Sequence, residues 1–156
     1  MEITYVHPHL IVSEEVNDTN QEVFLASAEE IFKLSRQAHG IHKSAYAIAH
    51  SQVEGTSPLR FFVTYQGDVF INPKITRHTK VPIAKHEGCM SFPTTPPASV
   101  MRFNKIEVEY QYFNIGMPKP WVISDVIKES VKGLAAQVFQ HEVDHMDAKY
   151  VHQLPL

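Results

Sequence analysis

Two periodicities of apolar residues divide the chain into helical and extended segments. Over residues 21–38 the apolar side chains recur at a spacing close to helical, which predicts an amphipathic helix that ends near Gly40. Residues 105–113 instead alternate between apolar and polar side chains, a pattern typical of an antiparallel strand with one buried face. The chain therefore combines both kinds of regular structure.

Shorter segments predict further strands. Residues 59–65 and 69–71 have the composition of strands and flank a turn. Pro73 is expected to end the second of these strands because proline lacks the donor that a strand ladder needs. Residues 45–53 are rich in small side chains and extended in character, and residues 121–127 suit another short strand.

A last helix is predicted over about residues 130–146, where one stripe carries apolar side chains and then histidines. Leu134 and Val138 precede His141 and His145 on this stripe at helical spacing. Such a face is typical of the wall of a pocket rather than of a solvated surface. Because several strands precede this helix, we expect an α+β fold.

Composition and charge exclude several classes of function. The chain has 156 residues, enough for one domain with a real core, and we expect residues 1–156 to form that single domain. Its net charge of −3, with scattered basic residues, predicts no nucleic-acid surface, and no apolar run approaches the ~20 residues of a membrane span. The start resembles no secretory or transit peptide and there is one cysteine, so a reducing compartment, by default the cytoplasm, is expected.

Candidate metal chemistry is concentrated in the segment His-Glu-Val-Asp-His at residues 141–145. Two histidines four positions apart on a helix lie on one face and can bind one metal ion. Glu142, between them, can move protons beside a metal-bound water. The alternative is that these side chains belong to an ordinary solvated helix, because histidine and glutamate also occur together there.

A third metal ligand has to come from upstream of this segment. The zinc-protease extension needs a glycine and a histidine where this chain has Ala148 and Val151, and few residues follow His145. Cys89, the only cysteine, is the best candidate, because one thiolate and two histidines leave a fourth position open for hydrolysis. Alternatively Cys89 is a small buried apolar side chain, as most free cysteines are.

Two segments resemble the second and third signature motifs of peptide deformylases: residues 87–91 (Glu-Gly-Cys-Met-Ser) and residues 140–145 (Gln-His-Glu-Val-Asp-His). Those enzymes remove the formyl group from the initiator N-formylmethionine of new proteins. The likeness extends over about residues 39–154, with Gly133 and Leu134 at the start of the metal-bearing helix. It implies a compact fold in which antiparallel or mixed sheets surround this central helix, with the N-terminal helix added.

The resemblance also implies a role for each matching side chain. The implied metal ligands are Cys89, His141 and His145. The family usually holds ferrous iron and accepts zinc, nickel or cobalt, although zinc fits such ligands equally well on chemistry alone. Glu142 is the implied acid and base. Glu87 and Arg102 are expected to form a buried pair that holds the cysteine loop; the alternative is a surface ion pair worth ~1 kcal/mol or less.

The family's first motif, Gly-x-Gly-x-Ala-Ala-x-Gln, is degenerate at residues 45–52. Gln52 is present, and by resemblance its amide and the backbone N–H of Met90 bind the developing oxyanion; losing one such donor typically costs ~10²–10³ in rate. Alanine replaces both glycines, which adds methyl groups to the substrate groove or forbids positive φ. The residues expected to line this groove are Tyr46, Ala47, Ile48, Leu134, Gln137 and Val138.

Several questions stay open at this point. His50 is a filler on the other face of the sheet, which we prefer, or a pocket wall or substrate contact. Gln137 either favours a different first side chain of the substrate or points along the pocket rim. The expected function is deformylation of N-formylmethionyl peptides. The alternatives are a deformylase-like hydrolase of shifted specificity and a low-activity or non-catalytic metal- and peptide-binding homologue.

Partners follow from the same resemblance. The substrate is a formylated peptide, and neither nucleic acid nor membrane is expected to bind. Longer family members use a basic C-terminal helix on the ribosome, and a chain that ends at Leu156 is expected to lack that extension. A transient contact with the ribosome would then need another surface.

Overall fold

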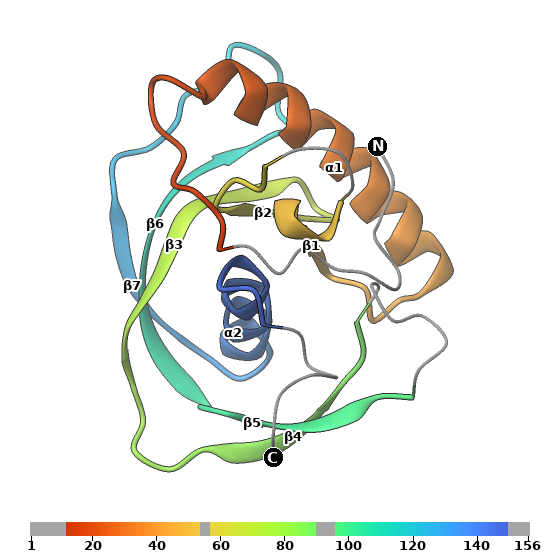
Figure 1. Ribbon diagram of the computed structural model, residues 1–156, viewed down its shortest axis with the longest axis vertical. Helices are drawn as coiled ribbons and strands as arrows, with labels where there is room; N and C mark the ends of the chain where they lie inside the picture. Colours follow the sequence, from red (N-terminus) through yellow and green to blue (C-terminus); the bar gives the residue numbers. More distant parts are fainter. Residues whose placement is uncertain (1–11, 54–56, 90–95, 150–156) are drawn as a thin grey trace.

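The computed structural model describes residues 12–53, 57–89 and 96–149 (Figure 1). In chain order the elements are α1 (Gln21–Ile41), β1 (Ala47–Ala49), the 3₁₀ turn η1 (His50–Gln52), β2 (Phe61–Thr64), β3 (Asp68–His78), β4 (Ile83–Glu87), β5 (Ala98–Arg102), β6 (Lys105–Asn114), β7 (Ile127–Lys132) and α2 (Leu134–Met146).

The strands form two antiparallel sheets around α2. Five strands pair in the order β1-β2-β3-β6-β7, and β4 pairs with β5. Figure 1 shows α2 nearly end-on between the long strands and the β4–β5 pair, with α1 lying over the other side of β2. The prediction of an α+β fold with antiparallel sheets around the helix that carries the metal motif is confirmed. Among the described residues, no helix is long and apolar enough to cross a membrane.

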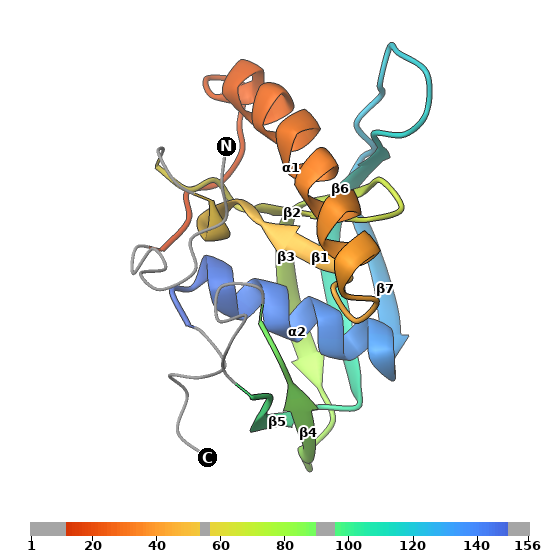
Figure 2. The same ribbon diagram turned by 90° about the vertical axis from the view of Figure 1, so that its right-hand side faces the viewer.

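Each face of the five-stranded sheet has its own hydrophobic core. In β2, Phe61 and Val63 pack on the α1 side, where the rings of Phe61 and Phe24 lie 4.8 Å apart. Phe62 points to the other face and contacts Phe139 of α2, with ring centroids 5.3 Å apart. Because successive strand residues face opposite sides, one short strand anchors both helices. Figure 2 shows the consequence, with α2 held between β1 and the β4–β5 pair.

β3 continues well beyond its predicted end. The expectation that Pro73 ends this strand is wrong, because the strand runs to His78. A register shift around Asn72 and Pro73 takes the proline out of the ladder with β6. Asn72 adopts a φ of 51°, and its side chain accepts a hydrogen bond from the Val16 N–H and donates one to the Val16 carbonyl. A bulge therefore absorbs the residue that usually ends a strand.

Three other element boundaries differ from the sequence expectations. α1 does not stop at Gly40, which lies within the helix. Residues 121–126 are irregular rather than a strand, and β7 occupies the positions where the last helix was expected to begin. Gly133, at φ +64°, turns the chain from β7 into α2, which begins at Leu134. The start implied by the family resemblance is therefore the correct one.

Candidate active site

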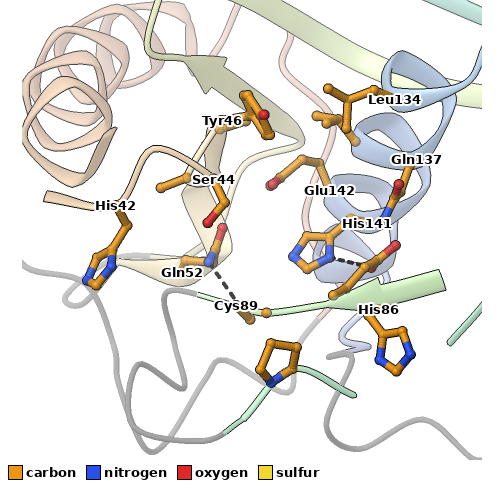
Figure 3. Close-up of a pocket in the computed structure, with 16 residues that line it drawn as sticks. His42, Ser44, Tyr46, Gln52, His86, Cys89, Leu134, Gln137, His141 and Glu142 are labelled. Carbon is orange, nitrogen blue, oxygen red and sulfur yellow. Dashed lines mark hydrogen bonds and ion pairs between the residues drawn. The ribbon is translucent and has the colours of Figure 1, made fainter. Parts of the chain in front are cut away.

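A cavity of about 470 Å³ lies between α2, the segment around β1 and the end of β4 (Figure 3). Figure 3 shows Tyr46 and Gln52 on one side and Gln137 and His141 on the other, with Cys89 at the base. These side chains come from three distant parts of the sequence. They meet because α2 packs against β1 and η1 and is hydrogen-bonded to the end of β4 through His141 and Glu87. β1 is an edge strand, and no described strand pairs with its other edge.

Cys89, His141 and His145 converge at this cavity. One ligand atom from each lies within 4.8 Å of the others. His141 and His145 occupy successive turns of α2 with rings 4.5 Å apart and perpendicular, and the Cys89 Sγ lies 3.6 Å from the Nε2 of His145. One thiolate and two imidazoles are a donor set that fits a single divalent ion with an open coordination position.

A buried carboxylate orients the first histidine. Glu87 Oε1 accepts a hydrogen bond of 2.8 Å from the Nδ1 of His141, so the Nε2 of that ring is left for a metal. Arg102 donates to both oxygens of Glu87 at 2.7 and 2.9 Å. Burial raises the pKa of Glu87, but the hydrogen bonds from His141 and Arg102 outweigh it and lower the pKa to about 2. Glu87 therefore stays ionised and acts on the site through His141.

Arg102 also reaches α2 directly. Its Nη1 donates to Asp144, which lies between the two histidines in the sequence and within one helical turn of both. The guanidinium thus joins β4, β5 and α2 in one network of charged hydrogen bonds. Sequence reasoning named the pair of Glu87 and Arg102 but missed Asp144 and the contact with His141. The only signal was a second acid inside the histidine motif.

Glu142 is the buried acid that faces the cavity. It is 3% exposed, and its Oε2 has no hydrogen-bond partner within the described part of the chain. Burial raises its pKa to about 7, with the nearby His141 opposing the shift. A carboxyl group with that pKa can take and return a proton at neutral pH.

Gln52 is held so that its amide NH₂ group faces the cysteine. Its Oε1 accepts a hydrogen bond of 2.9 Å from the Ala49 N–H, and its Nε2 lies 3.7 Å from the Cys89 Sγ. Ser51 donates to the carbonyl of His145 and so ties η1 to α2. Met90, expected to supply a second donor, lies outside the described residues.

The residues expected to contact the substrate are mostly brought together. Those that line the cavity are Tyr46, Ala47, Leu134, Gln137 and Val138. Ile48 is a correction: its side chain is 1% exposed and belongs to the core on the α1 side of the sheet. His50 is a buried filler, as preferred, whose Nδ1 accepts a hydrogen bond of 2.8 Å from the Leu59 N–H. His42, Ser44 and His86 also line the cavity, and no sequence pattern pointed to them.

Comparisons with known proteins agree with one another. The model of a family described as polypeptide deformylase matches residues 3–154. The chain is similar to a peptide deformylase of Thermotoga maritima, 34% identical over 109 residues, which are 68% of this chain and 59% of the relative. A peptide deformylase of Afipia carboxidovorans is 32% identical over 151 residues, 87% of this chain and 74% of the relative.

Solved structures show the same relationship. The crystal structure of the peptide deformylase from Thermotoga maritima superposes with a TM-score of 0.68 at 25% identity and covers 97% of each chain. Peptide deformylase 1B from Arabidopsis thaliana shares the fold, with a TM-score of 0.75 at 20% identity over 100% of this chain and 81% of that one. The chain spans between 50% and 59% of the length of the first curated relatives that it matches.

Proposed function

Because the chain belongs to the polypeptide deformylase family, we propose that it is a metal-dependent hydrolase that removes the formyl group from N-formylmethionyl peptides and releases formate. The observation that carries this proposal is the convergence of Cys89, His141 and His145 beside the buried Glu142. Three ligands with an adjacent acid and base form the minimum set for metal-assisted hydrolysis of an amide.

The proposed metal is one divalent ion held by Cys89, His141 and His145, and ferrous iron is our first choice. The donor chemistry accepts zinc, nickel or cobalt as well. When bound, such an ion lowers the pKa of water from ~15.7 toward ~7 and so makes a nucleophile available at neutral pH. Glu87 supports this role by fixing the ring of His141 through Nδ1.

Glu142 is the proposed proton carrier. Its carboxylate takes a proton from the attacking water while the oxygen of that water bonds to the formyl carbon. It then gives the proton to the nitrogen of the departing amine as the carbon–nitrogen bond breaks. The second proton of the water stays on the new oxygen and leaves when the resulting formic acid ionises, so the products are formate and a peptide with a free N-terminus.

Gln52 is the proposed donor to the formyl oxygen. That oxygen gains negative charge during the attack, and a prepositioned amide N–H stabilises it without reorganisation. The hydrogen bond from Ala49 supports this role because it turns the donor end of Gln52 toward Cys89. The backbone N–H of Met90 stays a prediction as the second donor, as do the cytoplasmic location and the ribosome contact.

The test is formate release by iron-loaded protein prepared without oxygen. We expect formyl-Met-Ala-Ser to be hydrolysed and acetyl-Met-Ala-Ser, which differs by one methyl group, to remain intact. Metal-loaded protein that leaves both peptides intact would contradict the proposal. That result would favour the non-catalytic alternative, against which the presence of Glu142 now argues.

A further inference from the structure

We propose that Gln137 is a specificity-determining residue that gives the first side chain of the substrate a polar partner. The chain would then accept a formylated peptide that begins with a neutral polar residue at least as well as one that begins with methionine. This inference rests on the proposed function and goes beyond it by naming the class of the first side chain.

Gln137 lies on α2 close to the proposed metal site. It lies four residues before His141, so the two Cα atoms are about 6 Å apart along the helix axis. Both side chains line the cavity, and Figure 3 shows Gln137 on the α2 wall near His141. Gln137 therefore lies about one helical turn from His141, the nearest proposed metal ligand on α2.

The first side chain of the substrate is long enough to reach Gln137. The Cα atom that bears it is two bonds from the formyl carbon. An extended side chain of four bonds at about 1.5 Å each spans about 5 Å. The peptide backbone can pair with the open edge of β1, which forms the opposite wall of the cavity. A side chain that leaves this backbone toward α2 then ends beside Gln137.

The amide of Gln137 is available to bind a polar group of the substrate. Its side chain is half-buried, and no described residue forms a hydrogen bond with its amide. Two acids line the cavity: Glu87 is paired and Glu142 is buried. Among the residues that the structure describes, no lysine or arginine lines it. A half-buried amide without a partner favours a ligand that supplies one, and the absence of countercharges favours a neutral ligand.

The test uses two substrates of nearly equal shape, formyl-Gln-Ala-Ser and formyl-Met-Ala-Ser. We expect the kcat/KM ratio of the first to the second to be one or higher for the iron-loaded protein. Gln137→Met keeps the length of the side chain and should lower the ratio about three- to tenfold, the value of one hydrogen bond. Gln37→Met, the same change on the exposed side of α1, is the matched control and should leave the ratio unchanged.

A ratio below one for the unaltered protein, or a decrease of less than threefold in Gln137→Met, overturns the inference, whatever the absolute rates are. The same two peptides also separate this result from a failure of the proposed function. If neither is hydrolysed, the proposed function fails, and calorimetry gives the ratio of their dissociation constants with metal-loaded protein. A Gln137→Met shift of threefold or more in that ratio still supports the polar contact, and a smaller shift still overturns it.

Discussion

The two walls of the cavity are held in place by different physics. On the α2 wall, a network of buried charged hydrogen bonds runs from His141 through Glu87 and Arg102 to Asp144. On the β1 wall, packing dominates: Ile48 and Ala49 enter the two cores, and the strand pairs on one side only. The first wall carries His141 and His145, two of the three proposed metal ligands, and the second is the wall along which we propose that the substrate binds.

This difference explains where the chain departs from the family pattern. A charged network tolerates few replacements, because removing one partner leaves the others buried without compensation. A strand edge held by packing accepts a change of small side chain at low cost. The departures at Ala45 and Ala47 lie on the second wall, whereas Glu87 and Arg102 are retained.

Replacement of Glu142 tests the chemistry of the α2 wall. Glu142→Gln keeps the shape of the side chain and removes its ability to take a proton, so kcat for formyl-Met-Ala-Ser should fall about 10²–10⁴-fold. Metal content, measured by mass spectrometry, should stay at that of the unaltered protein because Glu142 is not a proposed ligand. Glu107→Gln, on the exposed face of β6, is the matched control. Retained turnover in Glu142→Gln would contradict the assigned role.

Replacement of Arg102 tests whether the network holds the wall. Arg102→Met leaves Glu87 and Asp144 without their cation, and we expect the free energy of unfolding to fall by about 3–5 kcal/mol. Arg77 supplies the matched control, since its pair with Glu107 is exposed and 3.7 Å long; Arg77→Met should cost about 1 kcal/mol or less. Urea unfolding of the metal-free proteins measures both. Equal losses would mean that the buried network adds nothing.

The same contrast decides how much could be predicted from the sequence. The convergence of His141, His145 and Glu142 was predictable because their spacing on a helix fixes their relative positions, whereas Cys89 came from the family resemblance and from being the single cysteine. β4 and β5 were not predicted, although they frame the site. β4 is mostly exposed until Glu87, so its sequence carries no alternation between apolar and polar residues. Pairing between distant strands, rather than local pattern, creates this part of the wall.

Ile48 shows the limit on the other wall. The resemblance placed it in the substrate groove, but a strand alternates its side chains, and with Ala47 facing the cavity Ile48 has to face the core. The bulge at Asn72 and Pro73 is a second example, since a proline that usually ends a strand is accommodated by a neighbour with positive φ. Alternation alone would have placed Ile48 correctly, whereas the bulge depends on the contact of Asn72 with Val16, which the sequence does not reveal.

Replacement of Gln52 tests the proposed oxyanion donor, which lies beside β1 and faces Cys89. Gln52→Met keeps the length of the side chain and removes the amide donor, so kcat should fall about 10²–10³-fold. Because Gln52 is no proposed ligand, KM and metal content should change little. Steady-state kinetics on formyl-Met-Ala-Ser separate these quantities, and Gln37→Met again serves as the control. A rise in KM at constant kcat would instead indicate that Gln52 only binds substrate.

Replacement of Ala47 should have the smallest effect on stability and on kinetics. It tests directly whether the β1 wall is less sensitive to substitution than the α2 wall. Ala47 lies in β1 opposite Thr64, and positive φ among the described non-glycine residues is confined to Asn72 and Ala148. The backbone of Ala47 has a φ that any residue adopts, so alanine causes no strain here. The effect of replacing glycine is therefore the added methyl group, which narrows the cavity. Ala47→Gly should lower the free energy of unfolding by about 0.5–1 kcal/mol.

The kinetic effect of Ala47→Gly distinguishes a tolerated change from a selected one. If the methyl group only narrows the groove, KM for formyl-Met-Ala-Ser should fall by no more than about threefold, the value of one weak contact, while kcat stays the same. Ala28→Gly, buried in α1 away from the cavity, controls for the loss of stability and should leave KM unchanged. A tenfold change in kcat would show that the β1 wall takes part in catalysis and would remove the distinction between the two walls.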